Sequence, residues 1–203
     1  MVTIERNSPL TSQRLRAWTL QTCPAWEQFQ ATGVLRAEPR FIDPDFLPAY
    51  DWMNEQLTRW VGPPPVGVTY PIWLWRQWEG HSKPPDLRRN GQLPRGQCGV
   101  RLECELSSKN VLLSDFDLWH FVLNNRYLPN DEADADAFEA AYSQADTEAC
   151  VHKKVESWQR IFDLDWVDPT GFVTLPDAEK SIQGVVWQID LKEVRSARVF
   201  TAR

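Results

Sequence analysis

The chain has 203 residues and a formal net charge of −6, with 42% hydrophobic and 25% charged residues. This length fits about one domain, large enough to bury a substantial core, and the composition is ordinary for a soluble globular protein. The acidic balance makes extended nucleic acid an unlikely partner, because proteins that bind the phosphate backbone usually carry a basic face. No apolar run approaches the roughly 18 residues that a membrane helix needs, so we expect no membrane association.

The chain begins with a polar stretch that lacks periodicity. We expect residues 1–13 to form a disordered tail and residues 14–203 to form one globular domain. Residues 14–22 favour a short strand. A helix is then predicted from Cys23, and Gly33 is placed to end it because glycine readily adopts the left-handed conformation of a helix C-terminus.

The clearest predicted helix follows Asp43 and Pro44, a capping acid followed by proline at the first helical position. Its apolar residues recur at steps of three and four, which predicts one buried stripe. The stripe consists of Phe46, Tyr50, Met53, Leu57 and Trp60. Residues 70–78 then favour a strand with two largely apolar faces, one of which carries Trp73 and Trp75.

The central stretch changes its period. Residues 100–106 alternate between apolar and charged, as expected of a strand with one buried face. A second apolar run at 111–113 leads into a predicted helix. Ser114 or Asp115 is placed to cap this helix, and Asp117 falls in its first turn, where a negative charge is favoured.

The C-terminal part combines helical and extended patterns. An acidic, alanine-rich stretch at 130–147 favours a solvated helix, and helical spacing resumes over 151–162. Alternation over 182–189 predicts a strand, and 197–200 a last short one. The order of these elements predicts a single α+β domain with a mainly antiparallel sheet flanked by helices.

The four cysteines, Cys23, Cys98, Cys104 and Cys150, include no C-x-x-C pair. The N-terminus shows no signal peptide, so we expect a cytoplasmic location. The cysteines are therefore predicted to be reduced thiols rather than a disulfide or zinc framework.

A polar cluster lies at the junction of the central strand and helix. Asp115, Asp117 and His120 have the side chains of a metal site or an acid–base pair. A metal site would need further ligands, and only His81 and His152 remain to supply imidazoles. We therefore predict no metal site, and weigh a ligand-facing role against helix capping beside a surface histidine.

Basic residues gather between the two middle strands, where Arg88, Arg89, Arg95 and Arg101 accompany Lys83. They are either a phosphate or acidic-ligand site or ordinary solvated loop charges. The eleven tryptophans leave a similar pair of interpretations. They indicate an aromatic-rich core, or a pocket in which some rings stack on a flat ligand.

Five stretches carry a resemblance to a known family. They are W-T-L-Q-T at 18–22, T-G-V-L-R-A at 32–37, Y-P-I-W-L-W at 70–75, L-L-S-D-F-D-L-W-H-F-V-L-N at 112–124 and I-Q-G-V-V-W-Q-I at 182–189. On these stretches the chain resembles a bacterial family of unknown function, number 3841 among the domains of unknown function. The resemblance implies a shared fold and names no activity.

The order of elements is also similar to that of ADP-ribosyltransferase-like domains. There, a polar residue on the first strand and an aromatic residue on a middle strand hold NAD, and a late-strand glutamate orients the ribose. By position, this resemblance implies NAD as the cofactor, Thr19 or Gln21 for the first role, Tyr70 for the second and Gln183 for the third. Gln183 departs from the pattern, because an amide cannot take a proton from a nucleophile.

Three functions remain open. The first is a nucleotide- or NAD-handling domain with an aromatic-lined pocket, and the second is a non-enzymatic reader that stacks a nucleotide or base on the same rings. The third is a protein-interaction module. The candidate catalytic residues are Gln21, Asp115, His120 and Gln183, and the candidate ligand-binding residues are Trp18, Thr19, Tyr70, Trp73 and Asp117. The expected partner is a small nucleotide-like ligand or another protein.

Overall fold

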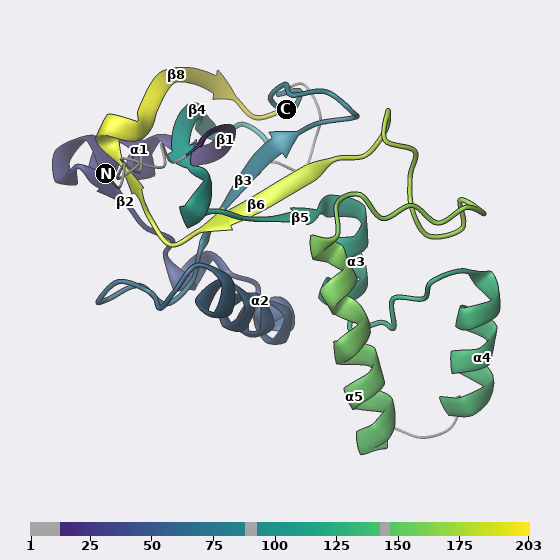
Figure 1. The fold of residues 1–203 in the computed structure, drawn as a ribbon. Helices are drawn as coiled ribbons and strands as arrows, with labels where there is room; N and C mark the ends of the chain where they lie inside the picture. The colour runs from purple at the N-terminus through teal and green to yellow at the C-terminus, as the bar shows by residue number, and fades with distance from the viewer. Residues whose placement is uncertain (1–12, 88–92, 143–146) are drawn as a thin grey trace, which may run out of the picture.

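A twisted six-stranded sheet forms the centre of the computed structural model, which describes residues 13–87, 93–142 and 147–203 (Figure 1). The predicted tail lies outside this description except for Gln13. All neighbouring strands are antiparallel. In spatial order the strands are β5 (Leu112–Asp115), β6 (Ile182–Val186), β3 (Ile72–Gln77), β1 (Arg14–Thr22), β4 (Cys98–Ser107) and β8 (Val194–Thr201).

A second, two-stranded sheet and five α-helices complete the described fold. The small sheet pairs β2 (Val34–Leu35) with β7 (Ile189–Asp190). The helices are α1 (Cys23–Thr32), α2 (Leu47–Trp60), α3 (Phe116–Leu123), α4 (Glu132–Tyr142) and α5 (Glu148–Ser157). In the view of Figure 1, α4 and α5 extend away from the sheet. The predicted α+β class with a mainly antiparallel sheet is confirmed.

Two apolar clusters hold the sheet between its covering layers. One joins α2 and α3 to the β6 side of the sheet, and it includes Trp52, Met53, Leu57, Leu118, Trp119, Ile161 and Val185. The other joins α1 and the small sheet to β1, β3 and β4, and it includes Phe29, Leu35, Leu74, Leu102, Leu106 and Ile189. Because burial of apolar area is the main favourable contribution to folding, these two clusters fix where the sheet and helices meet.

The strongest local patterns are confirmed. On β4, the residues at positions 100, 102, 104 and 106 are all buried, while the charged residues between them are partly exposed. Helix α1 ends at Gly33, whose φ of 79° is left-handed and whose N–H donates to the carbonyl of Phe29. The acidic helix α4 contains no buried residue, as expected of a solvated helix.

The predicted stripe of the second helix is partly wrong. Residues Pro44–Phe46 form a 3₁₀ turn, and the α-helix begins only at Leu47. The tighter turn changes the angular phase, so residues before and after it do not share one face. Phe46, in the 3₁₀ turn, is accordingly 38% exposed. Trp60 is the last residue of α2 and 61% exposed, which the turn does not explain, and Trp52, outside the predicted stripe, is buried.

The predicted strand over 182–189 is also two strands in different sheets. Strand β6 ends at Val186, and β7 begins at Ile189. Trp187 lies at the bend between them, where its indole donates to the carbonyl of Gly62 at 2.8 Å. Alternation continues through the bend, which is why the sequence pattern does not reveal it.

The prediction of four reduced cysteines is wrong for one pair. Cys23 and Cys98 form a disulfide with a Cα–Cα distance of 5.5 Å, while Cys104 and Cys150 are free and buried. Thr22 pairs with Gly99 in the β1–β4 register, so the two bonded cysteines lie at the same end of neighbouring strands. They are 75 residues apart in sequence, and no local spacing signals the pair.

Candidate functional site

A cavity of about 300 Å³ lies at the C-terminal end of β1. It is lined by residues 19–21 of β1, by residues 71–73 and 75 at the start of β3, by residues 36–38, 41 and 42, and by Tyr50 of α2. Three predicted site residues line it: Thr19, Gln21 and Trp73. The antiparallel pairing of β1 with β3 brings the two strands side by side although more than 50 positions separate Gln21 from Trp73. Because Trp18 lies opposite Trp75, Trp73 projects from the other face of the sheet than Thr19 and Gln21, and the cavity lies at the strand ends where both faces are within reach.

The polar side of the cavity comes from β1. Thr19 and Gln21 are two residues apart on one strand and therefore point to the same face. The Gln21 amide nitrogen donates to the Thr19 hydroxyl at 2.8 Å. Thr19 is buried and Gln21 partly exposed, so Gln21 is oriented by its neighbour and carries the amide that a ligand would meet.

The opposite side is aromatic. Tyr50 meets Trp73 edge-on, with ring centroids 5.6 Å apart, and Trp73 packs against Trp119 of α3 at 4.9 Å. Burial raises the pKa of the Tyr50 phenol, so this group stays protonated near neutral pH. Tyr70, the predicted aromatic residue of the middle strand, lies just before β3 and donates to the Asp51 carboxylate at 3.0 Å. It is not among the cavity-lining residues.

The rim carries one charge of each sign. Arg36 donates to the side-chain oxygen of Gln188 at 3.3 Å, which holds its guanidinium beside the cavity. Glu38 also lines the cavity and forms an ion pair with Arg40 at 2.7 Å. A single arginine at the mouth of an aromatic cavity can bind an anionic group of a ligand.

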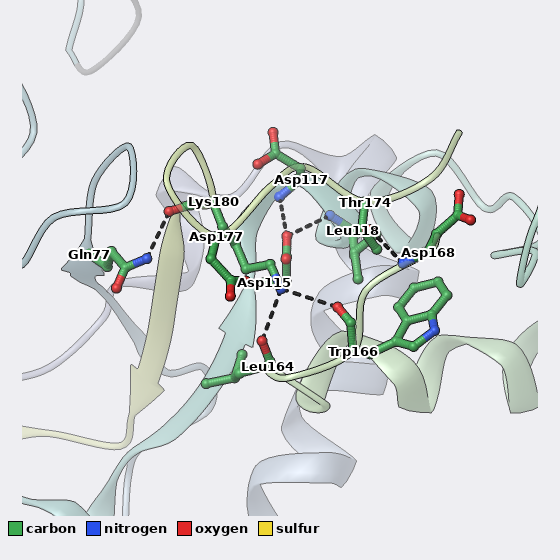
Figure 2. A network of polar contacts seen from close by, with 10 residues as sticks. All are labelled: Gln77, Asp115, Asp117, Leu118, Leu164, Trp166, Asp168, Thr174, Asp177 and Lys180. Carbon is green, nitrogen blue, oxygen red and sulfur yellow. Dashed lines mark hydrogen bonds and ion pairs between the residues drawn. The ribbon is translucent and has the colours of Figure 1, made fainter. Parts of the chain in front are cut away.

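The polar cluster of the central helix lies elsewhere, at the end of β5. The Asp115 carboxylate caps α3, accepting from the backbone N–H groups of Asp117 and Leu118 at 2.9 and 3.1 Å (Figure 2). His120 is exposed, with its Nδ1 3.0 Å from the carbonyl oxygen of Phe116. Burial raises the pKa of both Asp115 and Asp117.

A buried lysine that the sequence patterns do not single out completes this region. Lys180 donates to the carbonyl oxygens of Leu164 and Trp166 at 2.9 and 3.2 Å, and Figure 2 shows its ammonium pointing toward Asp115. Its charge opposes the rise in the pKa of Asp115. Lys180 therefore ties residues 164–166 to the segment before β6, and its ammonium lies near the carboxylate that caps α3. It also pairs with the exposed Asp177 at 3.6 Å.

The capping geometry gives a direct prediction for the cluster. Asp115→Ala should lower the free energy of unfolding by about 0.5–2 kcal/mol, because two backbone donors of α3 lose their acceptor. His120→Ala should change it by less than about 0.5 kcal/mol, since the ring is exposed. Urea denaturation measures both. Equal losses in the two variants would contradict the capping role.

Gln183 and Trp18 lie behind the cavity wall. Gln183 pairs with both Ser114 and Trp75 in the sheet and is only 5% exposed. Its amide nitrogen and the Ser114 hydroxyl are buried without a hydrogen-bond partner in the described part of the chain. Trp18 is also buried, with the Arg16 guanidinium 5.0 Å from its ring centre. Neither residue lines the cavity, but both contact or pair with Trp75, which does.

Sequence reasoning missed several lining residues. Tyr50 and Trp75 appear in it as core or strand residues, and nothing in it points to Arg36, Glu38 or Phe41. The segment from 36 to 42 lacks periodicity, so its return to the end of β1 has no local signal.

The described residues contain neither a candidate metal cluster nor a membrane-spanning helix. Among the described residues, no group of three or more His, Cys, Asp or Glu side chains is placed to hold a metal ion. Within the same residues, none of the helices combines the length and apolar character that crossing a membrane requires. The cytoplasmic location stays a prediction.

Comparison with known proteins gives one match. The model of a family described as "Domain of unknown function (DUF3841)" matches residues 16–195. Neither the curated proteins nor the solved structures contain a match.

Proposed function

The chain belongs to the DUF3841 family, and we propose that it binds a small nucleotide-like ligand in the cavity at the end of β1. One observation carries this proposal: aromatic rings, an oriented amide and a guanidinium line the same cavity. An aromatic ring can stack on a base, an amide can read its edge, and arginine suits a phosphate. The volume of about 300 Å³ is at the lower end of ligand sites, which favours a mononucleotide or one half of NAD.

Calorimetric titration with AMP, ADP-ribose and NAD tests the proposal. Stacking on an aromatic side chain contributes about 1–3 kcal/mol per base, so Trp73→Leu should weaken binding by about tenfold or more. Gln21→Ala should weaken it without the packing loss of a tryptophan variant. Trp60→Leu is the matched control, because Trp60 is exposed and outside the cavity. Equal weakening by Trp60→Leu, or no binding of any of the three ligands, would contradict the proposal.

A second candidate is ADP-ribosyl transfer from NAD. The observation that favours it is Glu38, a carboxylate in the cavity wall beside the β1 residues to which the resemblance assigns NAD binding. Gln183 lies outside the cavity and is not an acid, so Glu38 is the better candidate to stabilise the developing charge on the ribose.

Release of nicotinamide from NAD separates the two candidates. A transferase should release it, and Glu38→Gln should abolish the release while leaving NAD affinity within about twofold. Binding of ligand without any release would assign the cavity to a non-enzymatic reader. A thermal-shift screen that is flat for every nucleotide would instead favour the protein-interaction module.

A further inference from the structure

A second cavity, of about 610 Å³, lies over β4 and β8. Arg101 of β4 and Arg198 of β8 line it, together with the apolar residues Trp78, Pro84 and Pro85 of the segment after β3. None of its lining residues belongs to the cavity at the end of β1, so the two are separate sites. Of the basic residues in the predicted cluster, Arg101 and Lys83 line it, Arg95 does not, and Arg88 and Arg89 lie outside the described residues.

The two arginines lie side by side on one face of the sheet. Arg101 and Arg198 are register partners, and paired residues of antiparallel strands project to the same face. Like charges in this position repel and destabilise the pair. Burial and the charge of Arg198 both lower the pKa of Arg101.

Two nearby arginines, one on β1 and one on β8, are neutralised by glutamates of β4. Arg16 forms an ion pair with Glu103 at 2.7 Å, and the Arg195 Nε donates to the Glu105 carboxylate at 2.6 Å. No ion pair joins Arg101 or Arg198 to a carboxylate in the described ranges. The charge of Glu103 offsets part of the repulsion felt by Arg101. An anion bound between the two guanidinium groups would offset more of it.

We infer that this cavity binds a phosphate monoester, whose phosphate lies between Arg101 and Arg198 and whose organic part packs on Trp78 and the prolines. Two guanidinium groups present several fixed donors to phosphate oxygens, a geometry that a single lysine cannot supply. Glu79 and Asp86 also line the cavity, and Glu79 pairs with Lys83 at 3.6 Å. The cavity has three basic and two acidic lining residues, so its field is not broadly positive. Selectivity for a phosphate group therefore depends on direct contact with the arginine pair.

Titration of the full chain with phenyl phosphate and inorganic phosphate, at constant ionic strength, tests the inference. Phenyl phosphate should bind more tightly than inorganic phosphate, because its ring adds contact with the apolar lining residues. Arg101→Gln and Arg198→Gln should each weaken phenyl phosphate binding by about tenfold or more. Arg195→Gln is the matched control: it removes the same charge from β8, but at a residue already paired with Glu105. Its affinity should stay within about twofold.

Equal weakening by Arg195→Gln and Arg198→Gln, or no saturable binding at millimolar phenyl phosphate, would overturn the site. A second measurement separates ligand binding from a role in folding. Without ligand, Arg198→Gln should leave the melting temperature unchanged or raise it, since a repulsion is removed. A lower melting temperature in both Arg101→Gln and Arg198→Gln would assign the pair to the fold instead.

Discussion

Replacing Lys180 with methionine should lower the free energy of unfolding by about 2–4 kcal/mol, because two buried backbone carbonyl oxygens lose hydrogen bonds from a charged donor. Lys180 is only 3% exposed, and its ammonium donates to two backbone carbonyl oxygens. Methionine keeps the length of the side chain but supplies no donor. The carbonyl oxygens of Leu164 and Trp166 would be left without this donor, and Asp115 would lose the nearby positive charge.

The loss of unfolding free energy in Lys180→Met should depend on pH, because Lys180 affects the pKa of Asp115. Burial raises the pKa of this carboxyl above its ordinary value of 3.8, while hydrogen bonds from α3 and the charge of Lys180 oppose the rise. A raised pKa means that the folded protein binds more protons than the unfolded one between the two pKa values, so stability falls as pH increases through that window. Lys180→Met should raise the pKa of Asp115 further, because the opposing positive charge is removed. The pH range over which stability falls should then extend to higher pH. The difference from wild type should therefore shrink as pH falls through this window toward 3.8.

Urea denaturation at several pH values measures both effects. Lys192→Met is the control, because Lys192 is a highly exposed lysine that pairs with Asp190 at 3.1 Å. An exposed ion pair contributes little, so this variant should lose less than about 1 kcal/mol. A similarly small, pH-independent loss in Lys180→Met would contradict the role assigned to the buried ammonium.

The sequence predicted an element correctly where one structural feature accounts for its residue pattern. The alternation on β4 follows from one buried and one open face, and the end of α1 follows from the left-handed Gly33. The patterns failed where a backbone change left the apolar spacing intact. The 3₁₀ turn before α2 and the bend at Trp187 are such changes, since neither interrupts the apolar sequence.

The candidate site was predictable only within single strands. Thr19 and Gln21 share a face because they are two residues apart, and this follows from the sequence. Their approach to Trp73 depends on the pairing of β1 with β3, and the position of Asp115 depends on β5 lying at the sheet edge. Strand order is a long-range property. Local sequence patterns therefore cannot show whether the candidate residues Gln21, Asp115 and His120 lie in one pocket.

The buried ammonium and the disulfide share the same limitation. Lys180 precedes β6 as an isolated lysine. Its carbonyl acceptors at 164 and 166 and the nearby Asp115 come from two other segments, and only Asp177 is close in sequence. Cys23 and Cys98 likewise meet only because β1 pairs with β4. Neither pattern has a fixed spacing that sequence reasoning can recognise.

Breaking the Cys23–Cys98 disulfide should lower the free energy of unfolding by about 2–4 kcal/mol. The bond closes a loop of 75 residues, and in the chain-entropy account a loop of this size restricts the unfolded chain by about 4 kcal/mol. Cys98 is exposed, so a reductant has access to the bond. Thermal denaturation with and without dithiothreitol should therefore show a lower melting temperature in the reduced protein.

The double variant Cys23→Ser/Cys98→Ser is the control. It should melt near the reduced wild type and respond no further to dithiothreitol. Thiol titration gives an independent test, because burial raises the pKa of Cys104 to about 12, and both free cysteines are buried. Without reductant, two thiols should react in denaturant. In the folded protein Cys104 should react slowly because the thiolate is the reactive form, and Cys150 because burial blocks access to it. Four reactive thiols in denaturant would show that the bond is absent, and the ends of β1 and α1 would then be held to β4 by hydrogen bonds and packing alone.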